Sequence, residues 1–255
     1  MIFIPLSDDN PLRFVPYQWV TVGLIAVNVV VFLWQITGIG PTPGASFALV
    51  PSELFQVGIF GGPANGRYDT IAVPEGYTLL TYMYFHADFL HLSSNMLFLW
   101  VFGDNVEDAM GHLKYLFFYT ACGVAGGLAH ACLSPSSWLP LVGASGAVAG
   151  VIIAYLMLHP HVRVWVLAFR VIPMRITAVW ILGVWIATQV FMLAFSRGEQ
   201  VAWSAHIGGM IAGATLILVL RRPGVPLFDR DLATSEESCC SIVGHAVPSA
   251  PSEVP

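Results

Sequence analysis

The sequence predicts an all-α, polytopic membrane protein with six transmembrane helices. Hydrophobic residues make up 56% of the 255-residue chain and charged residues only 10%, whereas soluble domains carry about 25% charged residues. Six apolar runs each approach the ~20 residues that a helix needs to cross the hydrocarbon core of a bilayer. The lipid bilayer is therefore the expected partner of these runs. No nucleic-acid partner is expected, because the sequence has no basic stripe of the kind that binds nucleic acid.

The six apolar runs are separated by segments that contain charges, prolines or glycines. The first run has no charged residue, and the second has only Asp88, near its first end. The fourth run is short, because Pro140 and the sequence HPH at 159–161 bound it. The N-terminal segment lacks the basic region of a signal peptide, so the first run is expected to remain as a span. The expected spans are residues 18–37, 79–103, 115–134, 141–158, 176–196 and 200–220.

The positively charged residues indicate how these spans are oriented. With the N-terminus inside, only Arg67 and Arg197 of the ten basic residues lie outside. This is the bias that orients membrane proteins, so both termini are expected to be cytoplasmic. The basic residues expected inside are Arg13, Lys114, Arg163, Arg170, Arg175, Arg221, Arg222 and Arg230.

The chain is expected to have three parts. Residues 1–17 form a cytoplasmic N-terminal segment, and residues 18–220 form the membrane domain, whose long first loop covers residues 38–78 on the outside. Residues 221–255 are polar and contain many prolines and serines, a composition typical of a disordered tail. The compact six-span form, with no organelle presequence at its N-terminus, favours a bacterial inner membrane.

Four polar residues on three different spans are expected at one depth below the outer face. With a rise of ~1.5 Å per residue, Ser145 lies ~6 Å into the fourth span and His206 ~9 Å into the sixth. In the second span, His91 and Asn95 lie ~3 Å and ~9 Å in, and their i,i+4 spacing places them on one helical face. All three spans run from outside to inside, so the four side chains can meet.

Small residues accompany two of these polar side chains. Ser145 lies in the sequence GASGAVAG, and His206 shares a helical face with two glycines three and seven positions later. Glycines at such spacing let transmembrane helices approach closely. The glycines expected at a contact between the fourth and sixth spans are Gly146, Gly150, Gly209 and Gly213.

The combination of these residues indicates nucleophilic catalysis. A serine nucleophile needs a base within hydrogen-bond reach, and the imidazole of His206 has an unperturbed pKa of about 6.5. His91 and Asn95 carry N–H donors of the kind that stabilise an oxyanion. The fourth and sixth spans offer no buried aspartate, so the pattern predicts a Ser–His dyad rather than a triad. Simple helix packing and polar contacts between helices remain alternative explanations for each residue alone.

The histidines and cysteines give no clear metal site. The sequence has no H-E-x-x-H motif, and no carboxylate lies at the depth of the four polar residues. No cofactor is expected. Cys122 and Cys132 are expected to be small buried residues. For Cys239 and Cys240, in the tail, unstructured thiols, lipidation and metal binding all stay open.

Three segments resemble the rhomboid family of intramembrane serine proteases: 86-HADFLHLSSN-95, 143-GASG-146 and 205-AHIGG-209. The resemblance covers about residues 10–220 and implies a six-helix rhomboid-like bundle with a long, partly embedded first loop. It implies that Ser145 is the nucleophile and His206 the general base. It also implies that His91 and Asn95, with the Ser145 backbone N–H, bind the oxyanion, and that Gly143 shapes the turn before the serine.

The resemblance further implies cleavage of transmembrane segments of other proteins near their outer ends. It implies that substrate enters by movement of the fifth span, where removal of the bulky Trp185 or Phe191 is expected to keep or raise activity. One departure is Ala149, where several members have an aromatic residue that stacks on the base histidine. A non-catalytic relative that binds membrane-protein clients is the main alternative, and a small transporter or channel is a second one.

Overall fold

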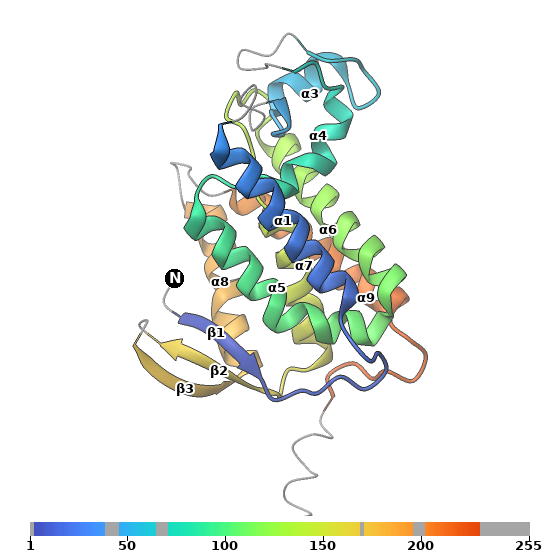
Figure 1. The fold of residues 1–255 in the computed structure, drawn as a ribbon, viewed down its shortest axis with the longest axis vertical. Helices are drawn as coiled ribbons and strands as arrows, with labels where there is room; N and C mark the ends of the chain where they lie inside the picture. Colours follow the sequence, from blue (N-terminus) through green and yellow to red (C-terminus); the bar gives the residue numbers. More distant parts are fainter. Residues whose placement is uncertain (1–2, 39–45, 65–70, 169–170, 196–201, 230–255) are drawn as a thin grey trace, which may run out of the picture.

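The computed structural model describes residues 3–38, 46–64, 71–168, 171–195 and 202–229 (Figure 1). These residues contain six long helices that run alongside one another and a small sheet at one end of the bundle (Figure 1). The long helices are α1 (Trp19–Thr37), α5 (Phe89–Met110), α6 (His112–Leu133), α7 (Ser145–Leu158), α8 (Ala178–Phe195) and α9 (Trp203–Leu220).

Four of these helices, α1, α6, α8 and α9, are long and apolar enough to cross a membrane. Helix α7 is apolar but has only 14 residues. Large apolar side chains on the outside of the bundle are exposed, for example Val30 (64%), Trp180 (71%) and Val219 (79%). Such a surface is unfavourable in water and suits contact with lipid.

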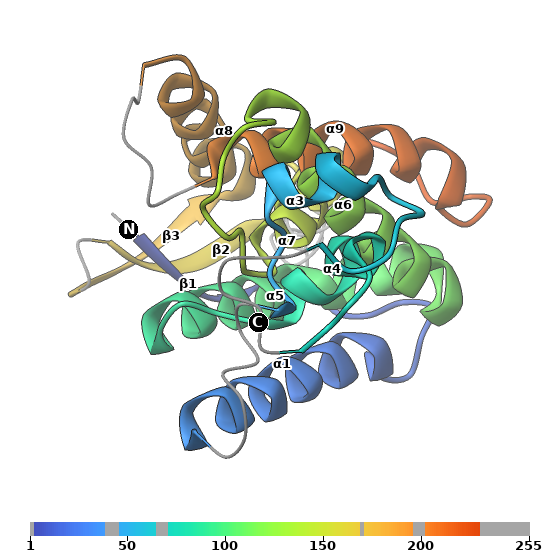
Figure 2. The same cartoon turned by 90° about the horizontal axis from the view of Figure 1, so that it is seen from above.

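Helix α7 forms the centre of the bundle. Seen from above, it lies in the middle, whereas α1 lies at the edge (Figure 2). Ten of its 14 residues are buried, and many of them are glycine or alanine. Because small side chains let neighbouring backbones approach, α7 can be enclosed by other helices, and α6 and α9 both pack against it. Ser145 is therefore placed by the most enclosed helix of the molecule.

The second span differs from the expected range of 79–103. The chain first forms the short helices α4 (Glu75–Thr81) and η1 (Tyr82–Tyr84), and α5 begins only at Phe89. Asp88 defines this start, because its carboxylate accepts a hydrogen bond from the backbone N–H of His91 (2.7 Å) and so caps the helix. The other end of α5 extends to Met110, seven residues beyond the predicted end at 103.

Two buried carboxylates explain why α5 continues beyond its apolar part. Asp108 accepts hydrogen bonds from the three consecutive N–H groups of residues 13–15, at 2.9, 2.7 and 2.6 Å. Glu107 accepts from the N–H groups of residues 20 and 21, at 3.0 and 2.8 Å, which lie in the first turn of α1. These N–H groups have no partner within their own segments, so the carboxylates both satisfy them and fix the N-terminal segment to α5.

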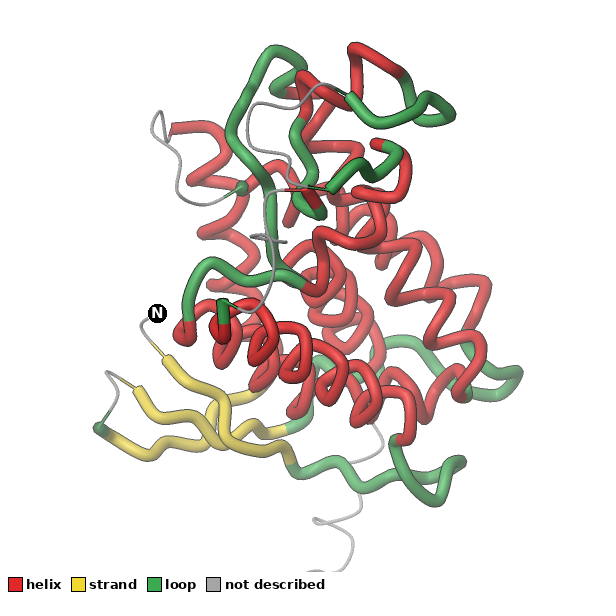
Figure 3. Tube along the Cα trace, turned by 45° about the horizontal axis from the view of Figure 1, so that its top comes forward, coloured by secondary structure: helices red, strands yellow, loops and turns green. Residues whose placement is uncertain are grey.

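The three-stranded antiparallel sheet was not expected, and the all-α prediction is wrong in this respect. Strands β1 (Phe3–Asp8), β2 (Arg163–Ala168) and β3 (Ile172–Thr177) form a sheet in the order β1-β2-β3, drawn in yellow at one end of the helices (Figure 3). In β2, Val164, Val166 and Ala168 are buried and alternate with residues that are exposed or half-buried. This alternation is the period of a half-buried strand, in a segment too short to stand out beside the long apolar runs.

The first loop also forms ordered structure. Helix α3 (Pro51–Val57) lies near α4 at the end of the bundle opposite the sheet (Figure 1). Leu49 forms an isolated antiparallel bridge with Leu141, just before α7 (N–H to O distances 3.0 and 2.8 Å). The loop is thus fixed to the segment that leads into Ser145.

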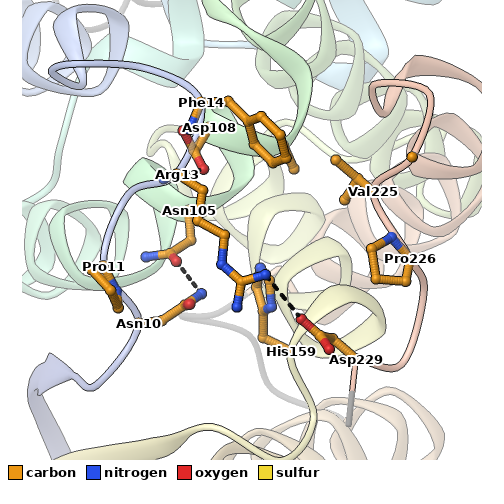
Figure 4. Close-up of a pocket in the computed structure, with 12 residues that line it drawn as sticks. Asn10, Pro11, Arg13, Phe14, Asn105, Asp108, His159, Val225, Pro226 and Asp229 are labelled. Atoms are coloured by element: carbon orange, nitrogen blue, oxygen red, sulfur yellow. Dashed lines mark hydrogen bonds and ion pairs between the residues drawn. The ribbon is translucent and has the colours of Figure 1, made fainter. Parts of the chain in front are cut away.

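The chain after α9 stays on the bundle as far as residue 229. The N–H group of Arg222 donates to the Ala109 carbonyl (2.8 Å), and that of Asp229 donates to the Leu158 carbonyl (3.0 Å). Arg13 and Asp229 form an ion pair (3.6 Å) in a small pocket that also includes Asn10 and His159 (Figure 4). The rest of the predicted tail, residues 230–255, lies outside the described residues.

Candidate active site

Ser145 and His206 lie in direct contact. The serine Oγ is 2.8 Å from Nε2 of His206, which joins the first residue of α7 to the second turn of α9. Ser145 is half-buried and His206 is 8% exposed. The two residues are 61 positions apart in the chain, and the structure brings them together. The predicted depth of Ser145, ~6 Å into its span, is wrong, because α7 starts at Ser145 rather than at Leu141. A serine and a neutral imidazole at this distance can share the serine proton.

The glycines expected at the helix contact lie between α7 and α9. A Cβ atom added at position 209 would be 1.9 Å from the carbonyl oxygen of Gly146, and one at position 213 would be 2.5 Å from that of Gly150. Real Cβ atoms do not approach so closely, so the two helices meet backbone to backbone. The contact begins one turn after His206 and brings its ring within reach of Ser145.

Ser145 also lies at the N-terminus of a helix. The first intrahelical bond of α7 runs from the Val148 N–H to the Ala144 carbonyl (2.9 Å). The N–H groups of residues 145–147 precede it and have no intrahelical acceptor. Such groups, together with the helix dipole, favour a negative charge at this end of the helix. The serine is therefore placed where an oxyanion would be stabilised.

Gly143 and His91 pack against each other beside this helix end. Gly143 has φ +121°, a conformation that other residues rarely adopt, and a Cβ at this position would be 2.6 Å from Cε1 of His91. Glycine is thus required both for the turn and for the closeness of the imidazole. The turn is fixed by a hydrogen bond from the Gly143 N–H to the Tyr82 carbonyl (2.9 Å).

Asn95 lies one turn after His91, as the i,i+4 spacing predicts. Its side chain is 5% exposed, and its amide nitrogen donates to the His91 carbonyl (3.1 Å). This bond uses one of the two amide hydrogens, so the other stays available for a ligand. Neither His91 nor Asn95 bonds directly to Ser145. The carbonyl group that Ser145 attacks would have to lie in the space between Ser145 and these two side chains.

His86, the first residue of the segment 86–95, also belongs to the site. It is fully buried, and its Nε2 is 3.5 Å from the backbone nitrogen of Ala144. Its ring meets that of His91 edge to face, with the centroids 5.1 Å apart. His86 therefore supports both the turn before Ser145 and the ring of His91.

Gln189, on α8, is a site residue that the sequence analysis missed. Its Oε1 atom is 2.7 Å from Nδ1 of His206, on the opposite side of the ring from Ser145. A lone amide in the middle of an otherwise apolar span is a signal that could have found it, because polar groups inside membranes are costly and usually have partners.

Two tryptophans hold the His206 ring in place of the aromatic residue that is missing at Ala149. The ring of Trp185, on α8, is stacked on the imidazole, with centroids 6.1 Å apart and an interplanar angle of 28°. The ring of Trp203 meets the imidazole edge to face at 6.0 Å. The aromatic contacts of the imidazole thus come from α8 and from its own helix rather than from α7.

A second serine–histidine pair lies elsewhere between α6 and α9. Nδ1 of His130 is 2.9 Å from Oγ of Ser204, which is 7% exposed. Ser204 lies on α9, two residues before His206, and its partner His130 lies on α6. The pair joins two helices and provides an internal comparison for the pair at Ser145.

The predictions for the two cysteines of α6 have different outcomes. Cys122 is buried as expected, whereas Cys132 is exposed, so the expectation of burial is wrong there. Cys132 lies in the last turn of α6, between the buried Ala131 and the exposed Leu133. Cys239 and Cys240 lie outside the described residues. Within the described ranges, no three histidine, cysteine or acidic side chains gather as metal ligands would.

Comparison with known proteins identifies the family of the chain. Residues 73–223 match the Rhomboid domain, and this range contains every candidate site residue named above. The chain is 32% identical over 176 residues to the rhomboid protease GluP of Bacillus subtilis, an alignment that covers 69% of this chain and 32% of that protein. It is 29% identical over 180 residues to the chloroplastic Rhomboid-like protein 11 of Arabidopsis thaliana, covering 64% and 59%.

A third relative, the putative rhomboid protease YdcA of Bacillus subtilis, is 29% identical over 122 residues, covering 44% of this chain and 57% of that protein. The chain thus spans between about a third and three-fifths of the length of these relatives. The match to the domain extends over more than half of the chain and includes the helices that carry Ser145 and His206. The chain is therefore a multi-pass membrane protein that belongs to the rhomboid family.

Proposed function

We propose that this protein is an intramembrane serine endopeptidase that cleaves transmembrane segments of other membrane proteins. The observation that carries the proposal is the 2.8 Å contact between Ser145 Oγ and His206 Nε2 at the N-terminus of α7. A serine beside a base and beside unbonded N–H groups has the parts that acyl transfer needs. The names of two relatives, rhomboid protease GluP and putative rhomboid protease YdcA, support the same activity.

The chemical steps follow from this arrangement. Ser145 Oγ attacks the carbonyl carbon of the scissile bond while Nε2 of His206 takes the hydroxyl proton. The resulting imidazolium gives this proton to the leaving amine, and the peptide bond breaks to leave an acyl-serine. Water then attacks the acyl group with His206 again as the base, and the serine and the acid product are released. No cofactor takes part in these steps.

The negative charge of the tetrahedral intermediate needs hydrogen-bond donors. The Ser145 N–H at the start of α7, the free amide hydrogen of Asn95 and the ring of His91 are the proposed donors. Gly143 lets the His91 ring lie over the turn that leads to this helix. Because the donors are fixed before the reaction, they stabilise the oxyanion without reorganisation.

The proposal includes the position of the site in the membrane. All six long helices cross the bilayer, with both termini on the cytoplasmic side as the basic residues predict. Helix α7 is only about 21 Å long, shorter than the ~30 Å hydrocarbon core, so its N-terminus with Ser145 lies below the outer surface. Substrates are therefore cut near the outer end of their transmembrane segments.

The test is cleavage of a purified single-span substrate in detergent. Wild-type protein is expected to cleave, whereas Ser145→Ala and His206→Ala reduce cleavage to background. The double variant is expected to be no worse than either single variant, because the two residues act as a unit. Ser204→Ala is the matched control, since it removes the hydroxyl of the other serine–histidine pair and is expected to keep the wild-type rate.

A fluorophosphonate probe provides an independent readout. It is expected to label Ser145, as peptide mapping would show, and not Ser204. Thermal unfolding of each variant checks that the fold is retained. If a folded Ser145→Ala protein cleaves like the wild type, the protease proposal fails. If the folded wild type binds the test substrate without cleaving it, a client-binding function takes its place.

A further inference from the structure

We propose that Gln189 is a positioning residue that fixes the tautomer of His206 and thereby makes the imidazole a base toward Ser145. This inference rests on the proposed protease function. It extends the dyad to three side chains linked by hydrogen bonds, on α7, α9 and α8. It depends on two contacts of the Gln189 amide, one with the His206 ring and one with its own helix.

The orientation of the Gln189 amide is determined by its second partner. The amide nitrogen Nε2 donates to the backbone carbonyl of Trp185 (3.0 Å), one turn earlier in α8. A carbonyl oxygen only accepts, so the NH₂ group must face Trp185 and the oxygen must face His206. The reversed amide would place two oxygen atoms against each other and leave two donors facing the ring.

The orientation of the amide then determines the tautomer of the imidazole. Gln189 Oε1 is 2.7 Å from His206 Nδ1 and is itself only an acceptor, so Nδ1 must carry the hydrogen. In a neutral imidazole, Nε2 is then the unprotonated nitrogen. That atom lies 2.8 Å from Ser145 Oγ, where its lone pair can accept the hydroxyl proton. The alternative tautomer would direct an N–H at the serine, and the ring could not act as its base.

The same contact remains useful after proton transfer. When Nε2 has taken the serine proton, both ring nitrogens carry hydrogens, and the Nδ1–H group keeps its acceptor in Gln189. A neutral amide stabilises the imidazolium less than a carboxylate would, but it introduces no charge into a site enclosed by helices. This avoids the cost of a buried unpaired carboxylate within the membrane.

The place of Gln189 on α8 distinguishes it from an ordinary lipid-facing residue. The buried residues of α8 are Ala178, Ile181, Leu182 and Gln189, so the amide is the one buried side chain in the second half of the helix. Its neighbours Thr188 and Val190 are exposed. A polar group in this position is costly unless both its donor and its acceptor are satisfied, and the two contacts satisfy both.

The test compares two substitutions of nearly equal size. Gln189→Leu removes the acceptor, whereas Gln189→Glu keeps an oxygen facing Nδ1. In a soluble serine protease, loss of the correct histidine tautomer costs about 10⁴ in kcat. Since the group lost here is neutral, we expect Gln189→Leu to lower kcat roughly 10- to 10³-fold with little change in KM, and Gln189→Glu to retain much more of the wild-type kcat.

Thr188→Val is the matched control on the same helix. The Thr188 hydroxyl bonds only to the Val184 carbonyl of its own helix (2.8 Å) and faces outward. Its removal is expected to leave kcat, KM and thermal unfolding unchanged. A fall in kcat for Thr188→Val as large as that for Gln189→Leu would mean that disturbance of α8, not loss of the acceptor, causes the effect.

A second measurement reads the tautomer directly and needs no substrate. Nitrogen-15 NMR of histidine-labelled protein distinguishes protonated from unprotonated ring nitrogens, and the His206 signals are assigned by their loss in His206→Ala. The wild type and Gln189→Glu are expected to show a protonated Nδ1 and an unprotonated Nε2. Gln189→Leu is expected to show a mixture of the two tautomers.

The outcomes separate this inference from the proposed function. If the wild type does not cleave the substrate, the protease proposal fails whatever the tautomer. If the wild type cleaves and folded Gln189→Leu has the same kcat and the same single tautomer, the protease proposal stands and the role of Gln189 is refuted. A protonated Nε2 in the resting wild type would also refute it.

Discussion

A Cβ atom at position 209 would lie 1.9 Å from the carbonyl oxygen of Gly146, so the two residues meet with no room for a side chain. The atom in the way is backbone and belongs to the enclosed helix α7, so it cannot move aside without displacing the helix. Ser145 precedes Gly146 directly, and His206 lies one turn before Gly209. The distance between nucleophile and base therefore depends on this contact.

We predict that Gly209→Leu abolishes cleavage and lowers the thermal unfolding temperature. Extra atoms in a packed core typically cost 1–3 kcal/mol, and a whole side chain against backbone lies at or above the upper end of that range. Gly183→Leu on α8 is the control, because a Cβ there meets nothing within 4 Å. Cleavage and unfolding of both variants check the prediction, and full activity of Gly209→Leu would contradict the close contact of α7 with α9.

The proposed oxyanion donors are expected to behave differently from the dyad. Loss of one donor costs roughly 10² to 10³ in turnover in a soluble serine protease. We predict a fall of this size or less for Asn95→Ala and for His91→Ala, because the Ser145 N–H remains as a donor. KM should change little. Steady-state kinetics check this, and a large rise in KM at unchanged kcat would assign these residues to substrate binding instead.

The contacts of α8 change an expectation drawn from the sequence. Trp185→Ala was expected to keep or raise cleavage, but the Trp185 ring stacks on His206. An aromatic contact of this kind is worth about 0.5–1.5 kcal/mol, so we predict roughly a 2- to 10-fold fall in kcat. Phe191 is 59% exposed on the same helix. For Phe191→Ala the expectation from the sequence is therefore unchanged, and this variant should keep or raise cleavage. Equal rates for the two variants would contradict a role of Trp185 in holding the base.

The stability of the protein should depend on the ionisation of Asp8, at the end of the bundle far from Ser145. Burial raises the pKa of Asp8 from 3.8 to about 7, although its carboxylate accepts a hydrogen bond from the Tyr155 hydroxyl (2.6 Å). A raised pKa means that the folded state holds this proton more tightly than the unfolded state does. The contribution of Asp8 to the free energy of unfolding is therefore full below the pKa of the unfolded state and is lost as the pH rises through about 7.

We therefore predict that Asp8→Asn gains stability relative to the wild type as the pH is raised from about 4 to about 7, the interval set by these two pKa values. Unfolding temperatures in detergent across this interval check the prediction. Asp9→Asn is the control on the same strand end, because the Asp9 side chain is 38% exposed and pairs with Arg175. A constant difference between the wild type and Asp8→Asn over the interval would refute the prediction.

The orientation in the membrane can be tested by cysteine labelling in a protein without its native cysteines. Leu139, in the loop before α7, is 64% exposed and is predicted outside, whereas Val171, between β2 and β3, is 73% exposed and is predicted inside. An impermeant reagent should label Leu139→Cys in intact cells and label Val171→Cys only after lysis. The opposite pattern would overturn the proposed topology.

The sequence by itself was sufficient for the parts of this protein that depend on local patterns. Hydrophobic length defines the long helices, and distance along each span places Ser145 and His206 at one depth. Glycine spacing indicates which helices meet, because residues three and four apart share a helical face. Each of these properties is set by neighbours within one helix. The meeting of Ser145 and His206 could therefore be predicted although 61 positions separate them in the chain.

Only the tertiary structure decided the features that depend on pairing between distant segments. The strands β1 and β2 become a sheet only when residues 3–8 meet residues 163–168. Asp108 extends α5 because its carboxylate meets N–H groups about 94 residues away. In the sequence, Gln189 is a lone amide in an apolar span with no identifiable partner. Only the packing of α8 places its oxygen against His206. A hydrogen bond needs a specific donor and acceptor within about 3 Å, and the sequence pattern of one segment contains no information on which distant atom will lie there.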